Sequence, residues 1–312
     1  LIGVILMVAS GVLSEAEAFT FVDWNVIAIL VGIWIIAGYF SKSGLPEWLA
    51  SHSLKVSRGK PANFAVLTGF LAALISMFVD NVVVVLMMAP MIFHLSRRLK
   101  FNPTPYILFI ALSANFMGTA LLLGDLPPQL LHSVAGVEFS EFVWQFGRPS
   151  SFPILLATFL VVLAYFWAKF KRKNWETDLK VERVGVPLLQ SRSMAYIAVL
   201  GFVLTVAFMA ARPLLGVTLG FIAVSGAAAT AFTVEVSSRL KGEGSLGSTF
   251  RDVLAELDWK AIFFYILLFS LVGGINKAGI IRMLADWMAP LMASGVFPGV
   301  SILFWVTAPV VA

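Results

Sequence analysis

Long apolar stretches dominate this chain and limit what it can fold into. Six of them are close to the ~20 residues that a helix needs to cross a lipid bilayer. They cover residues 24–40, 105–123, 152–170, 194–211, 214–234 and 259–276. Charged residues make up only 12% of the chain and hydrophobic residues 60%, so a soluble fold could not cover its apolar surface. The sequence predicts an all-α polytopic protein that is integral to the membrane, since barrel strands would be only ~10 residues of alternating polarity.

The composition also excludes several classes of function. The chain has no cysteine, which excludes disulfides, thiolate metal sites and cysteine catalysis. Its three histidines, His52, His94 and His132, are too few for a histidine metal cluster. The net charge of +5 is carried by short loops beside apolar runs, so we expect the lipid bilayer and no nucleic acid as a partner. We expect no enzymatic activity and no cofactor.

Loop charge orients the predicted helices. The loops 41–60 and 96–102 each carry a net charge of +3, and the loop 169–192 carries +4, whereas residues 14–23 carry −3. Short loops rich in lysine and arginine stay on the cytoplasmic side of a membrane. We therefore expect 41–60, 96–102 and 169–192 to be cytoplasmic, in a protein of the bacterial inner (plasma) membrane.

A longer apolar run of 34 residues, 62–95, is interrupted near its middle by Asp80-Asn81. Both of its flanks are basic, so both belong on the cytoplasmic side, and a re-entrant hairpin or a tight helix pair fits best. A carboxylate deep in an apolar run normally lies in a protein cavity or an ion pathway. The alternative is that Asp80 and Asn81 cap a helix in an ordinary turn outside the membrane.

A second interruption follows in the span 105–123. Asn115, Gly118-Thr119 and Gly124-Asp125 precede Pro127-Pro128. Proline cannot continue a helix, so we expect the span to break at this pair. Glycine permits close backbone approach, and Asp125 adds a second carboxylate near the break. The alternative is an ordinary helix exit.

The chain also contains an internal repeat. Residues 23–50 match residues 258–285 without gaps at an offset of 235, with eight identities in 28 positions that include Asp23-Trp24 with Asp258-Trp259 and Gly44 with Gly279. The topology above places the two copies in opposite orientations, as in the inverted repeats of many secondary transporters. The second hairpin tip would then fall near position 315, beyond Ala312, so we expect the chain to be a fragment.

At these residues the sequence resembles the ion transporter superfamily, which includes arsenite permeases, sodium/proton antiporters, citrate carriers and the melanosomal P protein. The resemblance is greatest to the P-protein and arsenite-permease branch. It covers nearly the whole chain and rests on Asp23-Trp24, Phe78-Val79-Asp80-Asn81-Val82, Gly118-Thr119, Gly124-Asp125 and Asp258-Trp259.

The resemblance implies an elevator-type transporter with inverted repeats, re-entrant hairpins and broken helices. Its parts would be the start of the first repeat with scaffold helices and an arm (1–61), a transport unit (62–137), further membrane helices (138–234) and a truncated second repeat (235–312). It also implies a homodimer formed through scaffold helices. Carried onto this chain, the ion-binding residues are Asp80, Asn81, Val82, Asn115, Gly118, Thr119, Gly124 and Asp125, with sodium at Asp80, Asn81, Gly118 and Thr119.

The leading hypothesis is secondary active transport of a small ion. Sodium or a proton would be the coupling ion, and the cargo would be an inorganic or small organic anion, or sodium would exchange for protons. One alternative is an intramembrane aspartyl protease that uses Asp80 and Asp125. Another is a passive channel.

Overall fold

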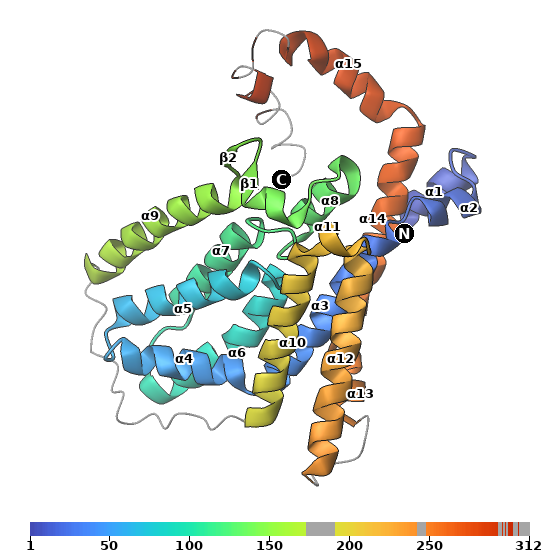
Figure 1. The fold of residues 1–312 in the computed structure, drawn as a ribbon. Coiled ribbons are helices and arrows are strands. Elements are labelled where there is room, and N and C mark those ends of the chain that lie inside the picture. Colours follow the sequence, from blue (N-terminus) through green and yellow to red (C-terminus); the bar gives the residue numbers. More distant parts are fainter. Residues whose placement is uncertain are drawn as a thin grey trace. The chain divides into compact units, whose positions relative to one another are not determined.

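The computed structural model describes residues 1–172, 191–241 and 248–292, with 295, 297, 299–301 and 305 nearer the C-terminus. The described chain is almost entirely helical (Figure 1). It forms two compact units, Trp24–Leu257 and Leu1–Asp23 together with Asp258–Ala312. Most of the loop 169–192 and most of residues 297–312, which would lead toward the second hairpin tip, lie outside the described residues, so their predicted roles stay predictions.

The described helices confirm the predicted all-α polytopic class. Six of them are long and apolar enough to cross a membrane: α3 (Trp24–Lys42), α6 (Asn81–Leu99), α9 (Ser151–Arg172), α10 (Arg192–Ala210), α12 (Leu219–Leu240) and α14 (Trp259–Lys277). Two shorter apolar helices are α5 (Pro61–Ser76) and α7 (Thr104–Gly118). The remaining elements of the larger unit are α4 (Leu45–Val56), α8 (Leu126–Ala135), the 3-10 turn η1 (Phe139–Phe142), the paired strands β1 (Trp144–Gln145) and β2 (Arg148–Pro149), α11 (Arg212–Leu215) and α13 (Ser248–Glu256).

The prediction for the break after α7 is wrong in one respect. The helix ends at Gly118 and not at Pro127-Pro128, and both prolines lie in the first turn of α8. Proline fits there because the first N–H groups of a helix have no partner within it. The prolines therefore begin a helix, and the break lies in the seven residues before it.

The predicted span 214–234 is also displaced. Gly216 has φ +66°, in the left-handed region, and ends the single turn of α11. The Thr218 side chain then caps α12, which begins at Leu219. Hydropathy does not reveal a left-handed residue, so it could not predict that Gly216 separates α11 from α12.

In the larger unit, α3 packs along α12, and α10 contacts both (Figure 1). Small residues bring the backbones together, as is common between helices in membranes. A Cβ at Gly32 of α3 would lie 2.6 Å from the backbone carbonyl carbon of Ala223 on α12. Nearer the start of both helices, the Asn25 side chain accepts a hydrogen bond from the Gly220 N–H at 2.8 Å. These contacts fix the register of the α3–α12 pair.

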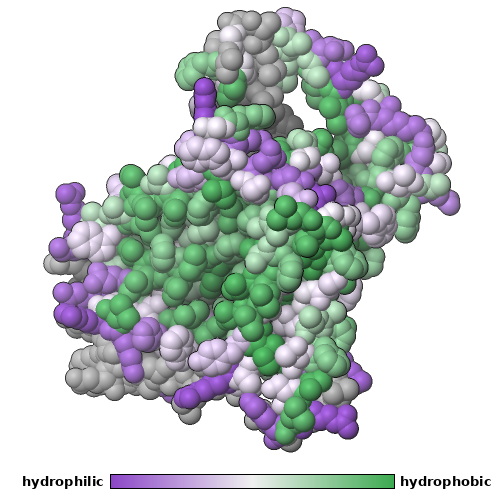
Figure 2. All heavy atoms as spheres, in the orientation of Figure 1, coloured by the Kyte–Doolittle hydropathy of each residue, from purple (hydrophilic) through white to green (hydrophobic). Residues whose placement is uncertain are grey.

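A second group of helices lies beside this pair in the same unit. Helix α5 packs along α7 and contacts α6 and α9. Their shared core includes Phe64, Ile92, Tyr106 and Ile110, all almost fully buried. On the face in Figure 2, apolar side chains cover the middle of this unit and hydrophilic ones gather at its lower margin. That distribution suits helices whose sides meet hydrocarbon and whose ends meet water.

The smaller unit contains α1 (Ile2–Ala9), α2 (Glu15–Thr20), α14 and α15 (Ile280–Met292). Both α1 and α2 contact α14. The Ser270 hydroxyl of α14 donates to the Ala18 carbonyl at 2.7 Å, and Lys277 pairs with Glu17 at 2.6 Å. These polar contacts join α2 to α14.

The local structure supports the internal repeat. Helix α3 runs from Trp24 to Lys42 and α14 from Trp259 to Lys277, so both ends correspond at the offset of 235. Each helix is followed by a left-handed glycine, Gly44 (φ +73°) and Gly279 (φ +78°), and then by another helix. The opposite orientation of the two copies stays a prediction.

We expect Gly32→Leu to destabilise the larger unit. The new side chain would meet the backbone of Ala223, which cannot move aside without separating α3 from α12. Overpacking of this kind costs about 1–3 kcal/mol. Thermal unfolding in detergent should show a lower Tm than for Ala228→Leu, a control at an exposed position of α12. Equal Tm values for the two variants would contradict the close packing.

The ion pair at Glu17 should make stability depend on pH. Its hydrogen bonds from Lys277 and then from the Ser14 N–H lower the pKa of Glu17 to about 2, and α2 lies outside the spanning helices. Because an unfolded glutamate has a pKa of about 4.3, this stabilisation is present above pH ~4 and is lost as the pH falls toward 2. Glu17→Gln should therefore lower the Tm at pH 7 and leave it unchanged near pH 2. An equal difference in Tm between Glu17→Gln and the unchanged protein at pH 7 and near pH 2 would contradict the low pKa of Glu17.

Candidate functional site

The predicted hairpin break lies between α5 and α6. Asp80 is the N-cap of α6, and its Oδ1 accepts the N–H groups of Val82 at 2.9 Å and Val83 at 3.4 Å. The residue is only 7% exposed. Asp80 therefore caps a helix, as the alternative prediction states, but it does so inside the protein and not in an open turn.

The second break joins α7 to α8. After Gly118, residues 120–123 are buried as they cross to Asp125, the N-cap of α8. Asp125 Oδ1 accepts the N–H of Leu126 at 2.8 Å. The Thr119 hydroxyl donates to the Phe116 carbonyl at 3.3 Å. Both breaks thus end in an aspartate that caps the next helix.

The structure brings the two breaks together. Asn81 Nδ2 donates to Asp125 Oδ2 at 3.0 Å, across 44 residues of chain. Gly124 packs against the carbonyl oxygens of Ser76 and Gly118 so closely that a Cβ would overlap both. We call Ser76, Asn81, Gly118, Gly124 and Asp125 the break cluster.

Two predicted site residues lie differently. The Val82 side chain is 56% exposed, and Val82 contributes only its N–H group, to Asp80. Asn115 is exposed on α7, and the described chain shows no hydrogen bond between it and the break cluster. Of the predicted site residues, Asn81, Gly118, Gly124 and Asp125 lie together in the structure. Asp80 and Thr119 are their neighbours in sequence. The side chains of Val82 and Asn115 lie outside this group.

The sequence did not select two buried polar side chains. Ser76 Oγ has no hydrogen-bond partner among the described residues, and neither has Gln129 Oε1, although the Gln129 amide reaches the Leu123 carbonyl at 3.4 Å. A hydroxyl in the last turn before a helix break could have indicated Ser76. Gln129 follows Pro127-Pro128 in the second break, but its burial depends on how α8 packs, which the sequence does not show.

The break cluster offers oxygen atoms of several kinds. They are the carbonyls of Ser76 and Gly118, the hydroxyl of Ser76 and the carboxylate of Asp125. These are the kinds of oxygen ligand that hard cations prefer. The described residues contain no group of three or more His, Cys, Asp or Glu side chains that could hold a transition metal.

Similar sequences identify the family. A family model described as citrate transporter (CitMHS) matches residues 1–310. The chain belongs to the citrate transporter family. This confirms the resemblance to the ion transporter superfamily, and it makes the protein a membrane transporter. The intramembrane protease alternative gains no support from it.

Similar sequences occur in bacteria and in an animal. A protein of Mycobacterium tuberculosis named an uncharacterized transporter is 27% identical over 317 residues, which cover 99% of this chain and 70% of that protein. Magnetosome protein MamN of Magnetospirillum gryphiswaldense is 24% identical, covering 98% and 68%. P protein of Sus scrofa is 25% identical but matches only 51% of this chain and 19% of its own length.

We expect substitutions at two glycines of the break cluster to have graded effects. A Cβ at Gly124 would overlap two backbone oxygens, whereas one at Gly118 would lie 3.1 Å from the Ser76 hydroxyl, which can rotate. Gly124→Ala should therefore lower the stability by about 1–3 kcal/mol, and Gly118→Ala by clearly less. Thermal unfolding of both variants checks the order. A larger loss for Gly118→Ala would mean that the two breaks do not meet as described.

Proposed function

We propose that this protein is a secondary active transporter that moves a small organic anion across the bacterial plasma membrane, coupled to sodium or a proton at Asp125. The observation that carries the proposal is the hydrogen bond between Asn81 and Asp125. It joins two interruptions of apolar helices at one place, which is how binding sites are built in many secondary transporters.

The two aspartates support different roles. The carboxylate of Asp80 accepts two N–H groups at the positive end of α6, which is enough to stabilise its charge. Asp125 accepts one N–H and the Asn81 amide, and no described lysine or arginine forms a salt bridge with it. A charge that crosses the membrane must be neutralised. Asp125 is therefore our candidate for the residue that binds the coupling ion, and Asp80 stabilises the site by capping α6.

The cargo proposal rests on the family and on two helix N-termini. The family is described as citrate transporter, so citrate is the first substrate to test. The N-terminal ends of α6 and α8 meet at the break cluster, and the positive ends of the two helix dipoles favour negative charge there, although Asp80 and Asp125 already accept the N–H groups of Val82, Val83 and Leu126. An anion with carboxylate groups suits these ends once a cation has neutralised Asp125.

We propose an elevator mechanism for the movement itself. Residues 62–137 would be the transport unit, which moves against scaffold helices, and the second repeat would supply an inverted counterpart. The matching ends of α3 and α14 and the left-handed glycines after them support the repeat. Pairing of two copies through scaffold helices belongs to the same proposal.

Transport by the full-length protein in proteoliposomes tests the coupling. We expect uptake of labelled citrate to follow an imposed sodium or proton gradient, and Asp125→Asn to lower gradient-driven uptake at least tenfold. Asp80→Asn should lower the Tm as well as the uptake, because it weakens the cap of α6. Asp252→Asn, at an exposed position of α13, is the matched control and should transport normally.

Three results would count against the proposal. Uptake that is indifferent both to Asp125→Asn and to collapse of the two gradients would remove the coupling role. Flux that does not saturate with citrate concentration would indicate a channel. Exchange of sodium for protons without citrate uptake would contradict the proposed cargo and leave the proposed cation site standing.

A further inference from the structure

An apolar cavity of about 290 Å³ lies between α3, α5 and α10, beside the hairpin break. Ala37 and Phe40 of α3 form one wall and Phe202 of α10 another. The end of α5 and residues Phe78 and Val79 of the break complete it. We call this space the hairpin cavity. All of the side chains that line it are apolar.

One wall of the hairpin cavity belongs to the segment that carries the break cluster. Phe78 and Val79 directly precede Asp80 in the chain. The Phe78 ring packs edge-on against Phe202, with 5.5 Å between the ring centroids. The other walls belong to α3 and α10. The cavity therefore keeps its shape only while the hairpin break stays in place against these two helices.

The surroundings decide what can fill the cavity. Helices α3 and α10 are long and apolar enough to span a membrane, and Ala37, Phe40 and Phe202 lie within them. Water would find no hydrogen-bond partner among the lining side chains, and a charged ligand would lose its hydration without compensation. Leu74, at the rim, is 44% exposed. The cavity therefore opens toward the hydrocarbon core of the bilayer, which consists of lipid acyl chains.

The volume of the cavity further limits which ligand it can hold. About 290 Å³ is at the lower end of the ~300–1,000 Å³ typical of small-molecule sites. That space suits a section of one unbranched hydrocarbon chain. A polar headgroup would find no hydrogen-bond partner among the lining side chains.

We propose that the hairpin cavity binds the hydrocarbon chain of a membrane lipid, and that its occupation stabilises this arrangement of the hairpin. The second half rests on the proposed function, because it requires the hairpin to move during transport. A ligand that fits one arrangement shifts the population toward that arrangement. A bound chain therefore slows transport without competing with the cargo.

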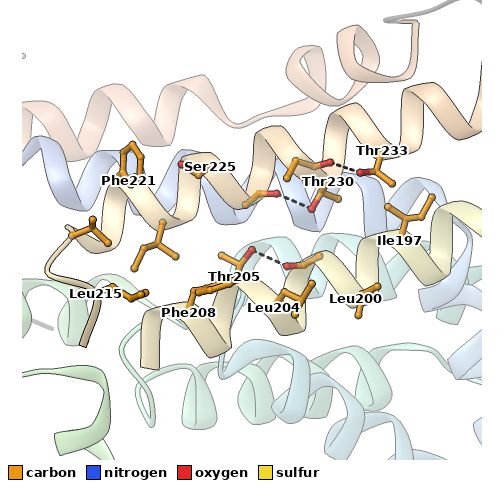
Figure 3. Close-up of a pocket in the computed structure, with 15 residues that line it drawn as sticks. Ile197, Leu200, Leu204, Thr205, Phe208, Leu215, Phe221, Ser225, Thr230 and Thr233 are labelled. Atoms are coloured by element: carbon orange, nitrogen blue, oxygen red, sulfur yellow. Dashed lines mark hydrogen bonds between the residues drawn. The ribbon is translucent and has the colours of Figure 1, made fainter. Parts of the chain in front are cut away.

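Another apolar site in the same unit serves as an internal control. The groove in Figure 3 lies between α10 and α12, has a volume of about 430 Å³ and includes Leu204 and Phe208. Its Thr205 and Thr230 hydroxyls donate to carbonyls of their own helices, at 2.7 and 2.8 Å. No lining residue of this groove belongs to the hairpin. It meets lipid without touching the break.

Photolabelling tests the binding. The full-length protein is placed in phosphatidylcholine nanodiscs that contain a lipid with a diazirine on its acyl chain, and labelled residues are mapped by mass spectrometry. We expect labelling at Phe78 and Phe202, reduced at least fivefold by Ala37→Phe, and labelling at Leu204 and Phe208 that the variant does not change. Ala157→Phe, at an exposed position of α9, is the matched control and should change neither.

The same variants test the consequence for transport. Ala37→Phe fills the cavity permanently, so citrate uptake should fall at least threefold at an unchanged KM, and the milder Ala37→Leu should act in the same direction at a normal Tm. Cavity labelling that neither variant reduces would overturn the binding site. Reduced labelling with normal uptake would overturn the effect on the hairpin alone. Normal uptake by Asp125→Asn with cavity labelling intact would instead overturn the proposed coupling.

Discussion

Two helix breaks inside a membrane protein can persist only if their exposed backbone groups find partners within the protein. In hydrocarbon no water is available to replace a lost hydrogen bond, so each unpaired group costs several kcal/mol. Here each break ends in an aspartate that caps the following helix, and the breaks pack on each other through Gly124 and the Asn81–Asp125 hydrogen bond. The positions of α5, α6, α7 and α8 all depend on this contact.

The same contact explains why two aspartates are tolerated among apolar helices. Asp80 accepts the N–H groups of Val82 and Val83 at the start of α6, which stabilise its negative charge. Asp125 accepts the Leu126 N–H at the start of α8 and the neutral amide of Asn81 from the other break. The cap formed by Asp125 is therefore also tied to the facing break, through the Asn81 amide.

Much of this could be predicted from the sequence, and the reason is the bilayer. Its thickness fixes the length of apolar helices, and a polar pair such as Asp80-Asn81 within a long apolar run marks a break. The exact end of α7 could not be predicted, because Pro127 and Pro128 fit the first turn of a helix as well as they end one. The role of Ser76 and the hairpin cavity depend on how distant segments pack, which no local pattern contains.

The three atoms nearest to a Cβ built on Gly124 are all main-chain atoms, and two of them are the carbonyl oxygens of Ser76 and Gly118. At this point the two breaks approach through backbone shape, and the Asn81–Asp125 hydrogen bond adds a side-chain contact beside it. Any side chain at this position would therefore hold the two breaks apart, whatever its polarity.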